Sequence, residues 1–245
     1  MVKPLFRWTI GNPSLVGLEI FKESVKKTTQ SLGINNFDWM ICHNNLSEEQ
    51  LKYIRKICDG KPIELKPQTP NDCPIPIQRP LKSMWKLCPP RMRLESHEII
   101  IDNDVILSKP LEQIDEFLQS NKIIWLDEPN RCFGKYDDIL DKSMVYNSGI
   151  IGLPPFYEFA RNLVKTWIKY DAFEQLDYCD EQGLVALTLK DEDKIIINRM
   201  EIQLVCPYDT GMNFKNAKGY HFIVANRLDK HEGWDWYKRS KIKII

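Results

Sequence analysis

The sequence predicts an α/β fold with a Rossmann-like, mixed but mostly parallel sheet flanked by helices. Three observations predict it. Strand-like and helix-like segments alternate through residues 4–65. The apolar run Ile99-Ile100-Ile101 has the composition of a strand that is buried on both faces. Hydrophobic residues make up 43% of the 245 positions and charged residues 28%, which suffices for a sizeable core and argues against disorder.

The N-terminal part predicts the order strand–helix–strand–helix–strand. Gly11-Asn12-Pro13 ends the first strand, and Ser14 and Gly33 are suitable caps for the first helix. The second helix begins with a sequence that resembles a capping box. This order is typical of a parallel, nucleotide-binding sheet. The strands are expected at residues 4–10, 37–42 and 62–65, and the helices at 15–32 and 47–58.

The rest of the chain predicts shorter elements around a long irregular loop at residues 67–80. No internal repeat and no clear domain boundary is visible, so the chain is expected to form a single domain over residues 1–245. Further strands are expected at residues 98–101, 122–126, 144–153, 195–197, 201–206 and 220–225, and helices at 81–94 (broken at Pro89-Pro90), 111–118, 156–170 and 180–189.

Composition excludes several classes of function. Lys plus Arg and Asp plus Glu both number 34, so no net charge draws the chain to nucleic acid. The seven cysteines are scattered and form no C-x-x-C pair, which argues against a zinc ribbon or a thioredoxin-like site and favours a reducing compartment. The start of the chain lacks the apolar run of a signal peptide, and no run approaches the ~20 apolar residues of a membrane span. A cytoplasmic location is therefore expected.

The last residues combine basic and apolar side chains. They are interpreted as a frayed strand or tail, with weak attraction to a membrane surface as the alternative. The basic residues are Lys238, Arg239, Lys241 and Lys243, and the apolar ones are Ile242, Ile244 and Ile245.

The central motif is Asp102-Asn103-Asp104, which directly follows the apolar run. Ligands of open α/β sheets bind at the carboxyl ends of the strands. Two carboxylates on a turn at that edge can both reach one hard cation, and Mg²⁺ or Mn²⁺ prefers such oxygen ligands. The alternative is an ordinary acidic turn whose side chains satisfy the backbone.

From Trp85 to Leu107 the sequence resembles the GT-A glycosyltransferases, whose signature is two aspartates around one residue (D-x-D). The resemblance extends to Tyr146–Ile151, similar to the asparagine-containing acceptor strand, and to Asp180–Leu184, similar to the acidic-glutamine helix start. It ends at Gly219–Phe222, similar to the late histidine of the metal site. The family 8 enzymes follow that histidine with a Gly and a Lys-Pro-Trp segment, whereas this chain has residues 223–227, Ile-Val-Ala-Asn-Arg.

The resemblance implies a metal site formed by Asp102, Asp104 and His221, which would hold Mn²⁺ or Mg²⁺. A neutral imidazole can join two carboxylates on Mn²⁺. The alternative for His221 is a hydrogen-bonded histidine within a strand, and His231 is the second candidate ligand.

Further residues are candidates for binding the donor and for the reaction. The turn after the first strand would hold the base and ribose, and basic side chains before the central strand would contact phosphates or sugar hydroxyls. The alternatives are a plain turn, a solvated helix face and, for the acidic helix start, ordinary helix-dipole chemistry. The donor-binding candidates are Thr9, Ile10, Gly11, Lys86, Arg91, Arg93, Asp102, Asn103 and Asp104, and the catalytic candidates are Asn147, Asp180, Glu181 and Gln182.

The resemblance therefore implies a metal-dependent glycosyltransferase of the hexosyltransferase type, with a UDP-sugar as donor and a carbohydrate or glycoconjugate as acceptor. Residues 1–107 would form the nucleotide-binding half and residues 108–245 the acceptor-binding half. Two alternatives stay open: a nucleotidyltransferase on a related sheet, and a non-catalytic carbohydrate-binding or interaction protein. The first usually has a Gly-rich, basic loop after strand one, which Gly11-Asn12-Pro13-Ser14 lacks.

Overall fold

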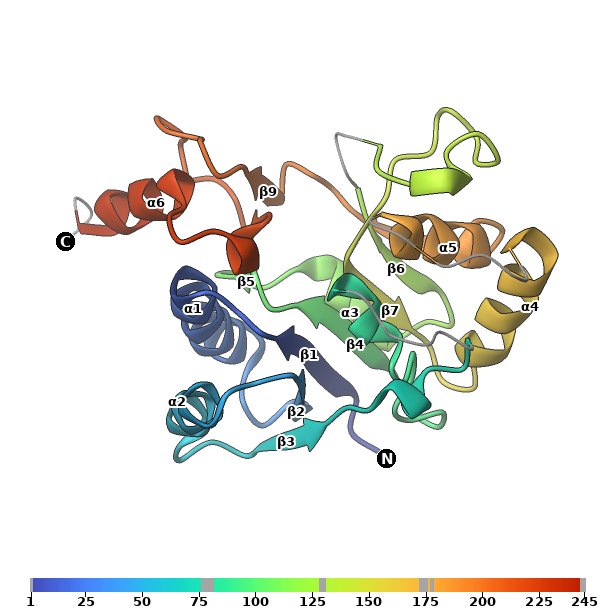
Figure 1. Cartoon of the computed structure of the whole chain (residues 1–245), viewed down its shortest axis with the longest axis horizontal. Helices are drawn as coiled ribbons and strands as arrows, with labels where there is room; N and C mark the ends of the chain where they lie inside the picture. Colours follow the sequence, from blue (N-terminus) through green and yellow to red (C-terminus); the bar gives the residue numbers. More distant parts are fainter. Residues whose placement is uncertain (1, 76–81, 128–130, 172–175, 177–178, 243–245) are drawn as a thin grey trace.

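The computed structural model of the chain describes residues 2–75, 82–127, 131–171, 176 and 179–242 (Figure 1). Within these residues, a seven-stranded sheet has the order β3-β2-β1-β4-β7-β6-β8, and a second sheet has the order β5-β10-β9. The strands are β1 (Leu5–Gly11), β2 (Asp38–Asn44), β3 (Ile63–Pro67), β4 (Glu98–Asp102), β5 (Val105–Leu107), β6 (Ile123–Leu126), β7 (Asn147–Leu153), β8 (Lys194–Ile197), β9 (Ile202–Val205) and β10 (Gly219–Phe222).

The large sheet is mixed and mostly parallel, as predicted. β1 runs parallel to β2 and β4, β2 is parallel to β3, and β6 is parallel to β8. Among the described strands of the large sheet, only β7 runs antiparallel to its neighbours, β4 and β6. The carboxyl ends of β1, β2, β3 and β4 therefore lie along one edge of the sheet, which is where such sheets bind ligands.

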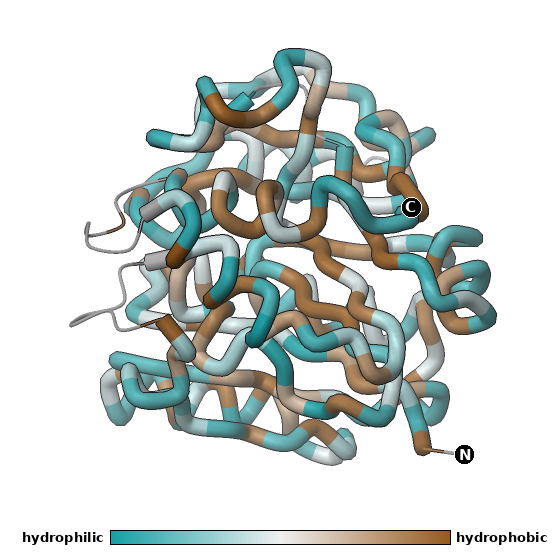
Figure 2. The backbone as a smooth tube through the Cα atoms, turned by 90° about the vertical axis from the view of Figure 1, so that its right-hand side faces the viewer, coloured by the Kyte–Doolittle hydropathy of each residue, from teal (hydrophilic) through white to brown (hydrophobic). Residues whose placement is uncertain are grey.

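Helices cover both faces of the large sheet (Figure 1). Ile99 and Ile101 of β4 belong to a core cluster with residues of α1, α2 and α3, while Ile100 belongs to a second cluster with residues of α4 and α5. Apolar residues gather along the inner segments of the chain and polar ones toward the outside (Figure 2). The helices are α1 (Leu15–Leu32), α2 (Glu48–Cys58), α3 (Glu112–Leu118), α4 (Phe159–Asp171), α5 (Asp180–Leu189) and α6 (Glu232–Ile242), with 3₁₀ helices η1 (Pro70–Asp72), η2 (Lys82–Leu87), η3 (Gly134–Tyr136) and η4 (Ala225–Arg227).

The predicted helix caps are confirmed. The Ser14 hydroxyl accepts from the backbone N–H of Gly17, and Gly33 has a φ of 82°, in the region that favours glycine. At the start of α2, Ser47 and Gln50 form both hydrogen bonds of a capping box. Cap residues lie within a few positions of the helix ends that they stabilise, so they can be recognised in the sequence. The bounds of α1 accordingly match the sequence-based expectation.

Two expectations about elements were wrong. The helix expected at residues 81–94 is a 3₁₀ helix, η2, followed by irregular chain at Pro89 and Pro90, since proline cannot continue a helix; residue 81 lies outside the described residues. The C-terminal segment is the helix α6 rather than a frayed strand or tail, and residues 243–245 lie outside the described residues. Trp234 and Tyr237, three positions apart, both face Phe222 on the small sheet, a spacing that suits a helix.

The cysteines are not all free thiols. Cys132 and Cys179 form a disulfide across 47 positions of sequence, which removes the argument from unpaired cysteines for a reducing compartment. Such pairing depends on the fold and is invisible in cysteine spacing. Among the described helices, none is both long and apolar enough to cross a membrane.

Candidate functional site

Two carboxylates and one imidazole meet where β4 ends. Asp102 is the last residue of β4, and Asp104 directly precedes β5. β10 runs antiparallel beside β5 and pairs His221 with Val105, which brings the imidazole to the same turn. One ligand atom from each of Asp102, Asp104 and His221 lies within 4.8 Å of the other two, and His221 Nε2 is 3.5 Å from Asp104 Oδ1. We call this group the Asp–Asp–His cluster.

The Asp–Asp–His cluster fits a divalent cation. Carboxylate oxygens suit Mg²⁺ and Mn²⁺, and an imidazole nitrogen shifts the preference toward Mn²⁺. Opposite ligands of such an ion are about 4.2 Å apart, so a movement of roughly half an ångström would close the cluster around it. Asp104 and His221 are buried, whereas the Asp102 side chain is 25% exposed. The cluster could therefore hold one ion and still leave a side open to a ligand.

Gly149 of β7 leaves the space that His221 occupies. A Cβ at position 149 would lie 3.0 Å from His221 Cε1 and 2.6 Å from Asn147 Oδ1. The Asn147 oxygen accepts from the backbone N–H of Gly149 at 2.6 Å. Asn147, a predicted catalytic residue, therefore lies on the strand next to the Asp–Asp–His cluster.

The Lys86 ammonium group lies among the acidic side chains of the site. Its Nζ is 2.8 and 3.0 Å from the two Asp102 oxygens, 3.0 Å from both Ser148 O and Ser148 Oγ, and 3.7 Å from Glu181 Oε1. Burial of this 2% exposed side chain lowers its pKa, but the carboxylates of Asp102 and Glu181 outweigh burial, so the pKa is raised. Lys86 stays charged and links the cluster to β7 and α5.

A buried ion pair that sequence analysis missed supports the segment around Lys86. Arg7 and Glu98 are both fully buried, and their Nε and Oε1 atoms are 2.6 Å apart. Arg7 Nη2 also donates to the backbone carbonyls of Lys86, Pro89 and Pro90. Because the pair joins residues 91 positions apart, no local pattern indicates it.

Asn103, between the two aspartates, is tied to the segment that follows His221. Its side-chain amide exchanges two hydrogen bonds with that of Asn226, at 2.8 and 2.9 Å. The backbone carbonyl of Asn226 in turn accepts from the N–H of Ser14, at the start of α1. Val224, just before η4, has a φ of 65°, which is rare for a β-branched residue and is often associated with functional turns. Asn226 thus connects the D-x-D turn to η4 and to the start of α1.

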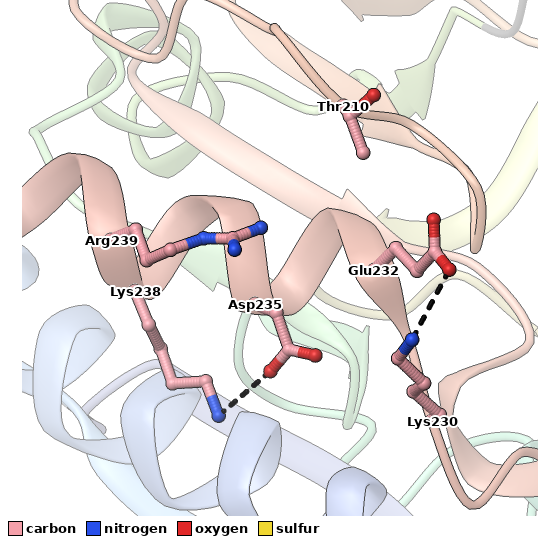
Figure 3. A pocket seen from close by; sticks show the side chains of 6 residues that line it. All are labelled: Thr210, Lys230, Glu232, Asp235, Lys238 and Arg239. Atoms are coloured by element: carbon pink, nitrogen blue, oxygen red, sulfur yellow. Dashed lines mark hydrogen bonds and ion pairs between the residues drawn. The ribbon is translucent and has the colours of Figure 1, made fainter.

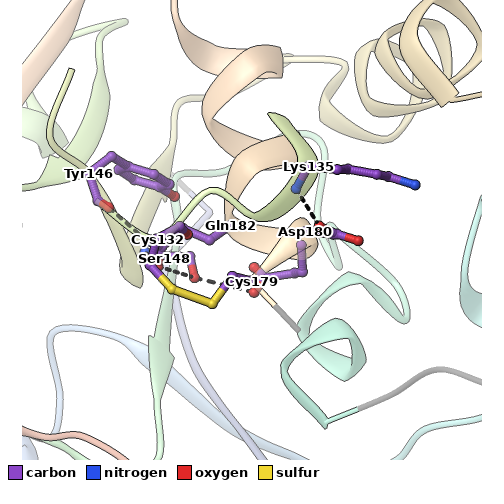
Figure 4. The surroundings of a disulfide bond; sticks show 8 residues. Cys132, Lys135, Tyr146, Ser148, Cys179, Asp180 and Gln182 are labelled. Carbon is purple, nitrogen blue, oxygen red and sulfur yellow. Dashed lines mark hydrogen bonds between the residues drawn. A yellow bond between two sulfur atoms is a disulfide. The ribbon is translucent and has the colours of Figure 1, made fainter. Parts of the chain in front are cut away.

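The predicted catalytic residues of α5 differ in what they contact (Figure 4). Gln182 Oε1 accepts from Ser148 N–H, and its Nε2 donates to the carbonyls of Cys132 and Tyr146. The Asp180 carboxylate accepts from the backbone N–H of Lys135 at 2.9 Å. These two side chains hold neighbouring backbone in place.

Glu181 is placed differently from the two residues that flank it. It lies 3.7 Å from Lys86 Nζ, and its Oε2 accepts from Ser148 Oγ at 3.4 Å. The structure therefore brings Glu181 to the Asp–Asp–His cluster through Lys86.

The predicted donor turn lies next to the Asp–Asp–His cluster. Thr9 is in register with Asp102 on the neighbouring strand, and its buried Oγ1 has no hydrogen-bond partner among the described residues. Gly11 ends β1 at the same edge. The Ile10 side chain is 1% exposed and belongs to the core with α1 and α2, so only its backbone is left to face a ligand.

Arg91 and Arg93, predicted to bind the donor, make no described contact with the Asp–Asp–His cluster. Arg91 donates to four backbone carbonyls, those of Arg93, Leu94, Ser96 and Tyr157. The Arg93 side chain pairs with Asp38 at the start of β2, and its backbone N–H donates to Glu98 at the start of β4. Asp102 is at the other end of β4, about 13 Å away for five residues of strand. The contacts of both arginines therefore lie near the start of β4, away from the end that carries the Asp–Asp–His cluster.

His231, the second candidate ligand, has a structural role. It is 1% exposed; its Nε2 is 3.2 Å from the carbonyl of Ile223, and its Nδ1 accepts from the N–H of Trp234. A hollow along α6 (Figure 3) is lined by charged groups that pair with one another, Lys230 with Glu232 and Lys238 with Asp235. Neither feature adds a ligand to the Asp–Asp–His cluster.

Comparison with solved structures shows that the chain has the GT-A fold. It is similar to the galactosyltransferase LgtC, crystallised with donor and acceptor sugar analogues, with a TM-score of 0.62 and 10% identity over 97% of this chain and 94% of that one. It is also similar to the bifunctional glycosyltransferase WbbM, with a TM-score of 0.63 and 11% identity over 96% of this chain and 49% of that one.

A third similar structure has a different activity. It is a 4-diphosphocytidyl-2C-methyl-D-erythritol synthase from Anaerococcus prevotii, with a TM-score of 0.51 and 12% identity over 98% of both chains. No protein-family model and no curated protein matches the sequence. At these identities the similarity shows the fold, and the activity has to be argued from the site.

Proposed function

We propose that the chain is a glycosyltransferase that moves a sugar from a nucleoside-diphosphate sugar to a carbohydrate or glycoconjugate acceptor. The observation that carries the proposal is the Asp–Asp–His cluster, three metal-ligand side chains within 4.8 Å at the carboxyl edge of a GT-A sheet. We further propose that a uridine nucleotide is the carrier and that the two halves, 1–107 and 108–245, bind donor and acceptor respectively.

In this proposal Asp102, Asp104 and His221 would hold Mn²⁺ or Mg²⁺, and the imidazole favours Mn²⁺. A bound ion would supply Lewis-acid stabilisation of the negative charge on the departing diphosphate. Asn103 keeps the turn in position through its pairing with Asn226. Lys86 keeps Asp102 oriented and adds positive charge beside the diphosphate.

With Arg91 and Arg93 directed elsewhere, Arg227 is the better candidate for a phosphate contact. It is exposed and follows Asn226, whose side chain touches the D-x-D turn. A guanidinium group binds phosphate oxygens with paired hydrogen bonds. On the other side of the cluster, Glu181 and Asn147 would contact sugar hydroxyls, while Asp180 and Gln182 position the backbone that carries them.

The nucleotidyltransferase alternative keeps a specific observation in its favour, since one similar structure is a diphosphocytidyl synthase. Both reactions would use an ion held by paired carboxylates. They differ in the products. A glycosyltransferase releases a nucleoside diphosphate from a sugar nucleotide, whereas a nucleotidyltransferase consumes a nucleoside triphosphate and releases pyrophosphate.

The test is to incubate the purified chain with Mn²⁺ and either UDP-sugars, with water or an added mono- or oligosaccharide as acceptor of the sugar, or nucleoside triphosphates together with sugar phosphates as acceptors of the nucleotidyl group. Release of UDP and of pyrophosphate is measured. We expect UDP release, which Asp104→Asn should reduce at least about a hundredfold. Asp191→Asn, at an exposed position, is the matched control and should keep the rate. Pyrophosphate release, or full UDP release by Asp104→Asn, would contradict the proposal. A non-catalytic binding protein would release neither.

A further inference from the structure

The hydroxyl group of Tyr146 is buried without a hydrogen-bond partner in the described part of the chain. Tyr146 directly precedes β7, and its side chain is fully buried. A tyrosine hydroxyl can both donate and accept, and burying one without a partner costs free energy. Phenylalanine would fill the same space without that cost, so the presence of the oxygen atom calls for an explanation.

The Tyr146 ring packs in the core between the large sheet and α5. Its centroid is 4.1 Å from that of Trp125 in β6, and it belongs to the core cluster that includes Leu184 and Val185 of α5. These two α5 residues follow Glu181 by three and four positions, so all three lie on one face of the helix. The tyrosine therefore packs against the face of α5 that carries Glu181.

Two carboxylates of the candidate site act electrostatically on the Tyr146 hydroxyl group. Burial raises the pKa of Tyr146 well above its ordinary value of about 10, and the negative charges of Glu181 and Asp102 raise it further. The hydroxyl group therefore keeps its proton and is available as a donor. Asp102 already has the Lys86 ammonium group 2.8 and 3.0 Å from its two oxygens. Glu181 is accordingly the better acceptor for Tyr146.

Two contacts of the Glu181 carboxylate with its neighbours are long. Lys86 Nζ is 3.7 Å from Glu181 Oε1, beyond the length of a hydrogen bond. The Ser148 hydroxyl donates to Glu181 Oε2 at 3.4 Å, and the same hydroxyl is 3.4 Å from Gln182 Oε1. These two contacts do not fix the direction of the carboxylate. A further donor from the core side would orient it more firmly.

We propose that Tyr146 is a positioning residue, whose hydroxyl group donates a hydrogen bond to the Glu181 carboxylate when a sugar donor occupies the site. This inference rests on the proposed function, in which Glu181 contacts sugar hydroxyl groups. The hydrogen bond would fix the direction of the carboxylate and thereby the orientation of the sugar. Orientation of a bound substrate lowers the barrier to reaction more than it strengthens binding. Tyr146 should therefore affect kcat and leave KM almost unchanged.

The first test removes only the oxygen atom. In Tyr146→Phe, kcat for UDP release from the UDP-sugar that the protein uses fastest should fall at least about tenfold, while KM stays within about twofold. The melting temperature should stay the same or rise, because an unpaired buried hydroxyl group is lost. Tyr237→Phe, at a tyrosine that is 2% exposed and stacks on Trp234, is the matched control and should keep kcat. An unchanged kcat in Tyr146→Phe, or a lower kcat together with a lower melting temperature, would overturn the inference.

The second test asks whether Tyr146 acts through Glu181. In a protein that already carries Glu181→Ala, the acceptor of the hydrogen bond is gone. Adding Tyr146→Phe should then lower kcat by no more than about twofold, against at least about tenfold in the unaltered protein. Equal losses in the two backgrounds would refute the role of Tyr146 while leaving the transferase proposal intact. If the unaltered protein released no UDP from any UDP-sugar, the proposed function would fail, and this inference with it.

Discussion

Single residues determine the charge balance of the site. Asp102, Asp104 and Glu181 contribute three carboxylates, and the Lys86 ammonium group contacts two of them, those of Asp102 and Glu181. Buried like charges repel one another strongly in a medium of low dielectric constant. A divalent cation at the Asp–Asp–His cluster would offset the remaining negative charge, which agrees with the proposed role of these residues.

Replacing Lys86 tests this balance. Lys86→Met should lower the free energy of unfolding by about 3 kcal/mol at neutral pH, because breaking a buried ion pair leaves carboxylates without a counter-charge. Urea denaturation measures the change. Lys122→Met, which breaks the exposed pair with Glu116, should cost less than about 1 kcal/mol. Equal losses of unfolding free energy in the two variants would show that Lys86 does not neutralise buried carboxylates.

His231 predicts a dependence of stability on pH. Burial lowers its pKa below the ordinary value of 6.5. The neutral ring fits its surroundings, donating from Nε2 toward the carbonyl of Ile223 and accepting at Nδ1 from Trp234, whereas a second proton would face the Trp234 N–H. Because the pKa is depressed in the folded state, the stabilisation is complete above pH ~6.5 and is lost as pH falls below it.

Thermal unfolding between pH 5 and 8 checks this prediction. The melting temperature of the unaltered protein should fall below pH ~6.5 more steeply than that of His231→Gln, which has no titrating ring. If the melting temperatures of the two proteins depended identically on pH, His231 would not be the cause of the pH dependence.

Among the site residues, sequence analysis identified those that lie within short motifs. Asp102, Asp104 and His221 could be named because the residues around each resemble a known pattern, and the structure does bring these three together. The Arg7–Glu98 pair and the buried hydroxyl group of Tyr146 could not be found in this way. Both are buried by contacts between distant segments, which no local spacing reveals.

At the scale of elements, the start of α5 depends on its link to the chain before η3. Cys179 has a φ of 70°, an unfavourable conformation for a residue with a side chain, and is bonded to Cys132 (Figure 4). The Cys132 carbonyl also accepts from Gln182. The disulfide therefore supports the turn from which Glu181 reaches the site.

Removal of the disulfide should lower both the free energy of unfolding and the rate of turnover. For a loop of 47 residues, the chain-entropy argument gives a loss of up to about 4 kcal/mol in Cys132→Ser. Denaturation with and without a phosphine reductant measures it, together with UDP release from a UDP-sugar. Cys58→Ser, at a free buried cysteine, is the control: it keeps the disulfide and should respond to the reductant as the unaltered protein does, whereas Cys132→Ser should not respond. An effect of the reductant on Cys132→Ser equal to that on the unaltered protein would contradict this role.

The elements that sequence analysis predicted well carry their own signals. α1 and α2 have caps, and β4 has a continuous apolar run. β5, with three residues, is too short for periodicity to be visible, and the aromatic residues of α6 are followed by basic ones, a pattern that also suits an exposed tail. Both segments become regular because of what they pack against, β5 against β10 and α6 against Phe222.

At the scale of the whole molecule, residues from distant parts of the chain form one site. Lys86 and Asp102 come from the first half, and Glu181 and His221 come from the second. A donor that binds there would connect the two halves. Any ligand that binds only the folded state raises its stability, by about 2.7 kcal/mol at a hundredfold excess over Kd.

A thermal-shift measurement checks this coupling. UDP and Mn²⁺ together should raise the melting temperature by roughly 5–10 °C, given about 2–4 °C per kcal/mol for a domain of this size. Either alone should have a smaller effect, because the ion and the diphosphate bind each other as well as the protein. A shift by UDP that is the same without any divalent cation would argue against a shared site.

The most direct measurement is calorimetric titration of Mn²⁺ into the protein in the presence of UDP. The account predicts one ion per chain, with affinity reduced at least about tenfold in Asp104→Asn and in His221→Ala and unchanged in Asp235→Asn, whose carboxylate lies on α6. If Asp104→Asn and His221→Ala bound Mn²⁺ as tightly as the unaltered protein, the ion would not bind at the Asp–Asp–His cluster. The proposed transfer reaction at that cluster would then be contradicted.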